Sequence, residues 1–248
     1  MEEWIVALLA AGMLVAAFGY ASVGHGGASA YIAAMALAGI APAEMRPIAL
    51  LLNILVSSLG SWKFYRAGYF RWRLFWPFAV VSIPMAYLGG AITLPGQAYK
   101  VLVGVVLLYA AWQLWRSGRR GDEMREIHEP PLGWAMLIGA AMGLLAGLTG
   151  VGGGIFLSPL LLMLGWAGTK QTSAVAAPFI LVNSIAGLAA VFVAKSAALP
   201  TYIWLLAAAV LIGGWLGAEY GAKRLANPVV RRVLAVVLAL AGAKMISV

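Results

Sequence analysis

Residues 24–28 read Gly-His-Gly-Gly-Ala, and residues 150–154 read Gly-Val-Gly-Gly-Gly. Each stretch stands between an apolar run that ends just before it and a short apolar run that begins just after it. This pattern predicts a helix that stops and restarts inside hydrophobic sequence. In a bilayer, backbone without helical hydrogen bonds is tolerated only where it is buried in protein or lines a polar cavity. We therefore expect these first and second glycine loops to form an internal site.

The composition of the 248-residue chain indicates an integral membrane protein. Hydrophobic residues make up 63% of the sequence and charged residues only 10%, whereas about one quarter of a soluble domain is charged. Cysteine is absent, which excludes disulfides and thiolate metal sites. The net charge is +9, but the basic residues fall between apolar runs, where they set membrane orientation rather than bind nucleic acid.

Ten apolar segments, five in each half, predict an all-α membrane protein. Most approach the roughly 20 residues that a membrane crossing requires, but the second and seventh segments are only about 15 residues long. Both follow a glycine loop, so we expect broken or re-entrant helices there. Charge does not decide whether these segments cross fully or turn back midway. The segments are 4–22, 27–41, 47–65, 72–94, 98–115, 132–149, 153–167, 172–194, 201–222 and 229–246.

The two halves align with one another, which predicts an internal duplication. With residue 24 placed on residue 150, the loop glycines coincide, and residues 54–58 (Ile-Leu-Val-Ser-Ser) fall on residues 180–184 (Ile-Leu-Val-Asn-Ser). An odd number of crossings in each repeat gives the halves opposite orientations, so we expect two inverted repeats. The predicted repeats are residues 1–115 and 132–248, joined by a polar linker at 116–131.

The distribution of basic residues predicts the orientation in the membrane. If all ten segments cross and the N-terminus is outside, thirteen of the 17 Lys and Arg residues lie on the cytoplasmic side and four on the outer side. This bias agrees with the positive-inside rule. We therefore expect a multi-pass protein with both termini outside and the linker in the cytoplasm.

The glycine loops do not complete a nucleotide-binding motif. Ile155 and Phe156 stand where a phosphate-binding loop would have Lys and Ser or Thr, and the dinucleotide fingerprint lacks its last glycine in both copies. We expect no cofactor, no metal site and no catalytic residue. Two interpretations remain: the free N–H groups of a helix start bind an anion, or the small residues serve close helix packing.

Several polar residues accompany the loops. His25 is either a satisfied buried group or a functional one that changes protonation near neutral pH, and Asn53 and Ser57 share a helix face. Arg46 and Lys170 are candidate cations, although Glu44 is placed to neutralise Arg46. The predicted substrate-binding residues are Gly24, His25, Gly26, Gly27, Arg46, Asn53, Ser57, Gly150, Gly152, Gly153, Gly154, Lys170, Thr172, Ser173, Asn183 and Ser184.

Together these motifs resemble the TauE/SafE sulfite exporter family. The likeness rests on the paired loops, on Phe156 and Pro159 after the second loop, and on the pairs Thr172-Ser173 and Asn183-Ser184. It covers nearly the whole chain. The resemblance implies transport of a small anion, typically sulfite or an organosulfonate, across a bacterial inner membrane. The first repeat departs from the second at His25 and at Arg46-Pro47, which argues against a symmetric site.

The sequence thus predicts a secondary transporter that exports a small sulfur oxyanion or sulfonate by alternating access, as a monomer or homodimer in lipid. Export is coupled to protons or follows the anion's own gradient and the membrane potential. One alternative is a membrane scaffold or assembly protein whose glycines serve packing alone. Another is an intramembrane enzyme, which lacks support because no cluster of His, Asp, Glu or Cys occurs within the apolar segments.

Overall fold

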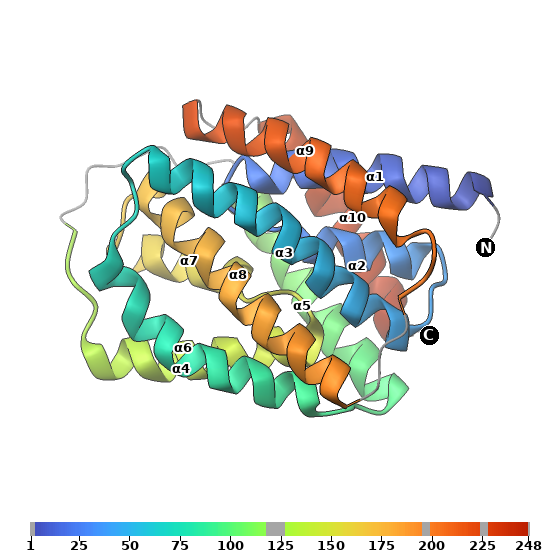
Figure 1. Cartoon of the computed structure of the whole chain (residues 1–248), viewed down its shortest axis with the longest axis horizontal. Coiled ribbons are helices and arrows are strands. Elements are labelled where there is room, and N and C mark those ends of the chain that lie inside the picture. Colours follow the sequence, from blue (N-terminus) through green and yellow to red (C-terminus); the bar gives the residue numbers. More distant parts are fainter. Residues whose placement is uncertain (1–2, 118–126, 195–198, 224–227, 248) are drawn as a thin grey trace.

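A computed structural model describes residues 3–117, 127–194, 199–223 and 228–247, and within these ranges every regular element is an α-helix. The predicted all-α architecture is therefore confirmed (Figure 1). Residues 118–126 of the predicted linker lie outside the described ranges. The helices are α1 (Glu3–Ala21), α2 (Ala28–Leu37), α3 (Pro42–Arg66), α4 (Trp72–Ala91), α5 (Gly96–Ser117), α6 (Leu132–Thr149), α7 (Gly154–Met163), α8 (Thr169–Val193), α9 (Ile203–Lys223) and α10 (Pro228–Ser247).

Six helices of the described chain are long and apolar enough to cross a membrane, namely α1, α3, α4, α6, α8 and α9. The outward faces of these helices carry large exposed apolar side chains, among them Leu137, Val193 and Trp204. A water-soluble protein would bury such side chains, whereas lipid tails accept them without cost. The molecule is a multi-pass membrane protein.

Helices α2 and α7 contain 10 residues each, which gives only about 15 Å of helix. The chain is non-helical between Ala21 and Ala28 and again between Thr149 and Gly154, so the helix breaks predicted at both glycine loops are present. In Figure 1, α1 runs inward from the end that carries both termini and α2 returns to that end. Helix α6 enters from the opposite end and α7 turns back toward it. Neither short helix crosses the molecule.

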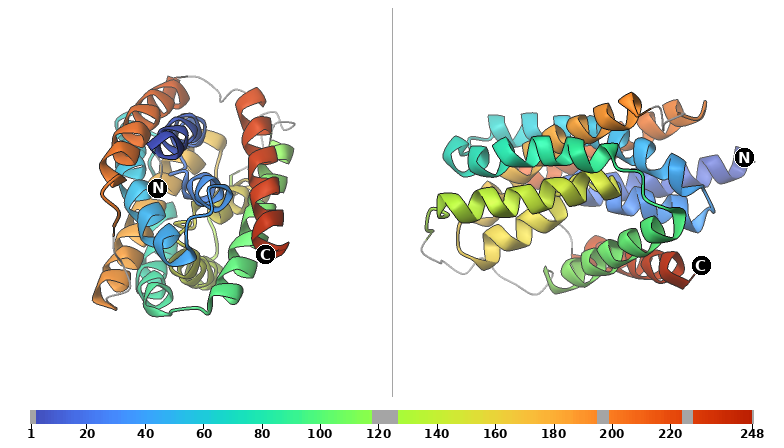
Figure 2. Two further views of the ribbon diagram at one scale, coloured as in Figure 1. Left: turned by 90° about the vertical axis from the view of Figure 1, so that its right-hand side faces the viewer. Right: turned by 90° about the horizontal axis from the view of Figure 1, so that it is seen from below.

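The halves of the chain are intertwined rather than placed side by side. Helix α4 packs on α6 and α8, α9 packs on α1 and α3, and α3 packs on α8. Helices α5 and α10 form a further pair, visible as green and dark red neighbours in both views of Figure 2. One hydrophobic core joins α1, α2, α3, α5, α9 and α10, and a second joins α4, α6, α7 and α8. Each core draws on both halves.

Two helix pairs approach so closely that only glycine fits between them. On α6, one glycine per turn faces the backbone of α4, and a Cβ added at Gly139 or Gly143 would overlap the main chain of Phe78 or Ser82. On α9, glycines at the same spacing face the backbone of α1. Membrane helices use such small-residue stripes for close packing. We call these two sets the packing glycines: Gly139, Gly143 and Gly147 on α6, and Gly213, Gly217 and Gly221 on α9.

Candidate functional site

The two glycine loops lie buried in the middle of the bundle, and Asn53 of α3 joins them. Its Oδ1 accepts a hydrogen bond of 3.1 Å from the backbone N–H of Ala28, the first residue of α2. Its Nδ2 donates to the carbonyl oxygen of Val151 in the second loop at 3.2 Å. Asn53 has no exposed surface. Two loops more than a hundred residues apart in the chain therefore share one side chain.

Tyrosines of the neighbouring helices hold the first loop in shape. The hydroxyl of Tyr31 donates to the carbonyl oxygen of Gly26 at 2.8 Å, and Ser29 donates to the hydroxyl of Tyr20 at 2.8 Å. Gly27 has φ of 98° at the start of α2, a conformation that disfavours any residue with a side chain. The loop is a built structure, not a simple interruption of a helix.

The second loop is held from α5 and α6. Tyr99 of α5 donates to the carbonyl oxygen of Thr149 at 3.2 Å, and the hydroxyl of Thr149 accepts from the N–H of Val151 at 3.3 Å. Gly150, Gly152 and Gly153 all have φ near 80°. Three left-handed residues within four positions turn the chain sharply enough for α7 to start beside the end of α6.

Several backbone N–H groups of both loops have no hydrogen-bond acceptor within the described chain. Such groups are expected at the start of a helix, where the preceding residues provide no carbonyl for them. Together with the positive end of the helix dipole they favour an anion. They belong to Gly26, Gly27 and Ser29 in the first repeat, and to Gly152, Gly153, Gly154 and Ile155 in the second.

Each glycine loop is covered by the start of a helix from the other half. A Cβ at Gly24 would lie 2.6 Å from the Cβ of Ser173 on α8, and the Ser173 hydroxyl donates to the carbonyl oxygen of Val23 at 2.8 Å. A Cβ at Gly150 would lie 3.0 Å from the Cγ of Arg46 on α3. The structure therefore brings Ser173 and Arg46 to the loops.

Arg46 is buried and bonds to the end of α4. Its guanidinium donates to the carbonyl oxygens of Gly90 at 2.5 Å and Ile92 at 3.0 Å. The ion pairs of the described residues are Lys63–Glu219 and Arg73–Glu129, so the predicted neutralisation of Arg46 by Glu44 is wrong. Carbonyl dipoles at a helix C-terminus stabilise a cation. The guanidinium of Arg46 is thus held at the C-terminal end of α4 with no ion-paired acid among the described residues, while its side-chain stem lies against the second loop.

The structure does not bring Lys170 to the loops. Its side chain is exposed at the start of α8, and its Nζ lies 3.1 Å from the hydroxyl of Tyr69. His25 is half-buried, with Nδ1 3.1 Å from the carbonyl oxygen of Val23 and its ring edge-on to Tyr20. These positions make Lys170 a residue of the surface and His25 a residue of the first loop.

The polar residues of α8 differ from those of α3. The hydroxyl of Ser57 donates to the Asn53 carbonyl oxygen at 2.5 Å, and Ser184 accepts from Asn53 Nδ2 at 3.4 Å. Asn183 has no exposed surface, yet neither Oδ1 nor Nδ2 has a hydrogen-bond partner within the described chain. Nearly all buried polar groups in proteins are paired. A carboxamide with both ends free is available to bind something other than the protein.

Sequence reasoning missed Tyr20, Tyr31 and Tyr99, because an isolated tyrosine in an apolar run gives no sign of its hydroxyl partner. It also missed the packing glycines, although their spacing of four residues on α6 and α9 is a signal that the sequence displays. Those six residues serve close helix packing. Most loop glycines are different because they have positive φ, as at Gly27, Gly152 and Gly153, whose N–H groups are also unpaired within the described chain.

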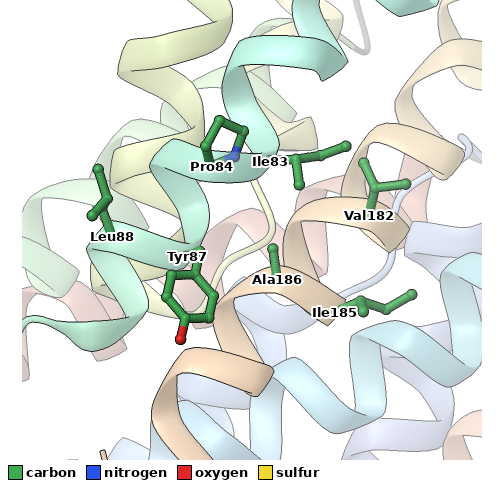
Figure 3. A pocket seen from close by; sticks show the side chains of 7 residues that line it. All are labelled: Ile83, Pro84, Tyr87, Leu88, Val182, Ile185 and Ala186. Atoms are coloured by element: carbon green, nitrogen blue, oxygen red, sulfur yellow. The ribbon is translucent and has the colours of Figure 1, made fainter. Parts of the chain in front are cut away.

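Two open hollows of the molecule are lined mainly by apolar residues and contain no glycine of the loops. Figure 3 shows a groove of about 700 Å³ between α4 and α8, lined by seven residues that include Pro84, Tyr87 and Ile185. A second hollow, of about 430 Å³, lies among α5, α6 and α7. The loop glycines are themselves buried, so they are enclosed in this conformation. Among the described residues no group of three or more His, Asp or Glu is placed to hold a metal ion.

Comparison with known proteins agrees with this architecture. A protein of Sinorhizobium fredii named "Probable membrane transporter protein y4hK" is 40% identical over 242 residues, which cover 96% of this chain and 97% of that protein. No solved structure matches the chain. The family described as sulfite exporter TauE/SafE matches residues 8–245. The chain therefore belongs to the TauE/SafE family of membrane transporters.

Proposed function

We propose that the protein is a secondary transporter that exports a small sulfur oxyanion or sulfonate across a bacterial inner membrane by alternating access. The observation that carries this proposal is the enclosed centre of the molecule. There, the starts of α2 and α7 carry unpaired backbone N–H groups, α8 carries the unpaired carboxamide of Asn183, and the stem of Arg46 lies against Gly150. An oxyanion of moderate size accepts several such bonds at once.

An inverted repeat supports alternating access. If α1 to α5 correspond to α6 to α10, then the packing of α4 on α6 corresponds to the packing of α9 on α1. The contact of Gly24 with Ser173 likewise corresponds to that of Gly150 with Arg46. Many transporters place their site between two such repeats and open it by moving one part against the other. We infer the same arrangement for this chain.

The membrane potential favours export of an anion. Because the cytoplasm is negative, outward movement of one negative charge is favourable by about 2.3 kcal/mol per 100 mV. Both chain ends lie at one end of the bundle, and α6 begins at the other (Figure 1). If the termini are outside, as the charge distribution predicts, the start of α6 lies in the cytoplasm. Proton coupling through His25 is the second part of the energetic proposal.

The proposal is tested by flux in liposomes. The purified protein is reconstituted into liposomes, which are loaded with isotopically labelled sulfite or a simple labelled alkanesulfonate. Efflux is compared with that from protein-free liposomes and from liposomes that contain Asn183→Leu. We expect saturable efflux that grows with an outside-positive potential and is inhibited by unlabelled sulfite. Efflux no faster than in protein-free liposomes, for both anions, would contradict transport and favour the scaffold alternative.

A further inference from the structure

Three buried polar side chains of α7 and α8 share an unusual property. Ser158, Thr172 and Asn183 are at most 5% exposed, and their side-chain oxygen or nitrogen atoms have no hydrogen-bond partner within the described chain. Leaving such a group unpaired in a protein interior costs about 1–3 kcal/mol each. Three of them in one part of the fold need a common explanation.

Their positions form a row. Thr172 and Asn183 are separated by eleven residues, or about three turns, and therefore lie on one face of α8 about 16 Å apart along the axis. Gly154 at the start of α7 packs against Ala176, since an added Cβ would lie 3.6 Å from the Ala176 carbonyl oxygen. Helices α7 and α8 are antiparallel. Ser158 lies one turn after Gly154 on α7, and Thr172 lies one turn before Ala176 on α8. Because the helices are antiparallel, Ser158 is therefore opposite Thr172.

The inner end of the row meets the second glycine loop. Phe179 and Ile180, which flank Asn183 one turn earlier on α8, approach the positions of Gly153 and Gly154 respectively. The other end of the row, away from the loop, lies in the first turn of α8, at the end of the molecule where α6 begins. The row thus connects that end of the bundle to the loop.

The first repeat has no matching row. In the alignment of the halves, Ser158 falls on Ile32, Thr172 on Arg46 and Asn183 on Ser57. Ile32 is apolar, Arg46 is bonded to α4, and Ser57 is bonded to its own helix. The hydroxyl of Ser61 on α3 is also unpaired, but it falls on Gly187 in the alignment and therefore on none of the three positions of the row.

We propose that Ser158, Thr172 and Asn183 line the path by which the anion travels between the cytoplasm and the second glycine loop. This inference rests on the proposed function. Hydroxyl and carboxamide groups donate hydrogen bonds to oxyanion oxygens without the tight binding that a full positive charge would impose. The positive dipole end of α8 lies at the cytoplasmic end of this path, and that of α7 lies at its loop end. Both favour an anion over a cation. Ser158 becomes a substrate contact of the transporter.

The path is tested first by thiol accessibility, because the chain has no cysteine. Ser158→Cys and Thr172→Cys are exposed to an anionic, membrane-impermeant methanethiosulfonate reagent in inside-out and right-side-out vesicles. Ser82→Cys is the matched control, since Ser82 is equally buried on α4 but bonded to the Ala79 carbonyl oxygen. We expect both path positions to react at least tenfold faster than the control, and only in inside-out vesicles. Reaction rates equal to that of Ser82→Cys would overturn the proposal.

Flux measurements separate this inference from the proposed function. Ser158→Ala and Thr172→Val remove one hydroxyl each and are expected to raise the KM for sulfite efflux about tenfold, whereas Ser82→Ala leaves it unchanged. Fast labelling without any sulfite efflux by the native protein would retain the path and reject the substrate. Normal efflux with an unchanged KM in both variants would retain the transporter and reject the path.

Discussion

Asn53 and Val151 are 98 positions apart in the chain, yet the carboxamide nitrogen of Asn53 donates a hydrogen bond of 3.2 Å to the carbonyl oxygen of Val151. The oxygen of the same carboxamide accepts the first N–H of α2. One side chain thus sets the distance between the two helix breaks. Asn183, equally buried on the neighbouring helix α8, bonds to neither loop.

This contrast predicts that replacing Asn53 by leucine lowers stability, whereas replacing Asn183 by leucine abolishes transport. Asn53→Leu leaves the Ala28 N–H and the Val151 carbonyl without their partner, so the free energy of unfolding should fall by about 2–4 kcal/mol. Asn183→Leu removes a buried group that has no partner, so the free energy of unfolding should stay the same or rise while sulfite efflux is lost. Unfolding in mixed micelles and efflux from liposomes measure the two effects. Equal destabilisation by both changes would contradict this assignment.

Gly152 and Gly39 offer a matched test of the second loop. Both have positive φ, 79° and 77°, so alanine at either position should cost about 1–2 kcal/mol of backbone strain. A Cβ at Gly39 meets nothing within 4 Å, whereas one at Gly152 would lie 2.5 Å from Asn53 Nδ2. We expect Gly152→Ala to abolish efflux and Gly39→Ala to retain it at similar expression. Full activity in Gly152→Ala would show that the loop does not contact substrate.

The two candidate cations should differ in their response to salt. Lys170 is exposed, so its attraction for an anion is screened, and the rise in KM caused by Lys170→Ala should fade between low and high ionic strength. Arg46 is buried beside the second loop, so the larger effect of Arg46→Gln should persist at high salt. Efflux of a sulfonate at several concentrations of an inert salt measures this. A salt-independent effect of Lys170→Ala would place that residue at the central site.

His25 should give the transporter its pH dependence. Protonation adds a positive charge to the first loop, so the affinity of the native protein for an anion should rise as the pH falls through the range in which histidine titrates. This rise should be absent in His25→Ala. An alkanesulfonate is the appropriate probe, because its own charge stays constant over that range whereas sulfite takes up a proton. An identical pH profile in both proteins would exclude His25 from coupling.

The predicted orientation is open to a direct test. Glu129 precedes α6 and is well exposed, and Ser247 is exposed at the end of α10. In intact cells, an impermeant maleimide should label Ser247→Cys but not Glu129→Cys, and disruption of the membrane should make both reactive. Labelling of Glu129→Cys in intact cells would reverse the orientation and the direction of the proposed path.

Local sequence was sufficient to predict the helices and their breaks. The bounds of α6 and α9 agree with the predicted segments within two residues, because apolar runs ended by Gly, Pro or charged residues determine helix length in a membrane. Helix α3 begins five residues before its predicted segment. The same runs do not state which helices touch. The pairing of α4 with α6 depends on glycines whose spacing only acquires meaning once two backbones meet.

The types of polar side chain at the site were predictable, but their hydrogen-bond partners were not. Asn53 and Asn183 were selected for the same reason, as amides in apolar sequence, and the structure gives them different roles. Arg46 was assigned an acid four residues or fewer away, yet it bonds to carbonyl oxygens at the end of a distant helix. Hydrogen bonds across a bundle depend on helix rotation and crossing, which composition and spacing do not encode.

The packing glycines also determine which parts of the molecule are able to move. Where backbone lies directly on backbone, as between Gly143 and Ser82 or between Gly217 and Phe18, there are no side-chain rotamers to rearrange, so each pair behaves as a rigid block. The contact of α3 with α8 is different, because a Cβ added at Gly187 would lie 3.6 Å from the side-chain carbons of Leu50 rather than on its backbone. We therefore expect the proposed rocking between inward- and outward-facing states to take place about this contact, with the pairs α1–α9 and α4–α6 each moving as a unit.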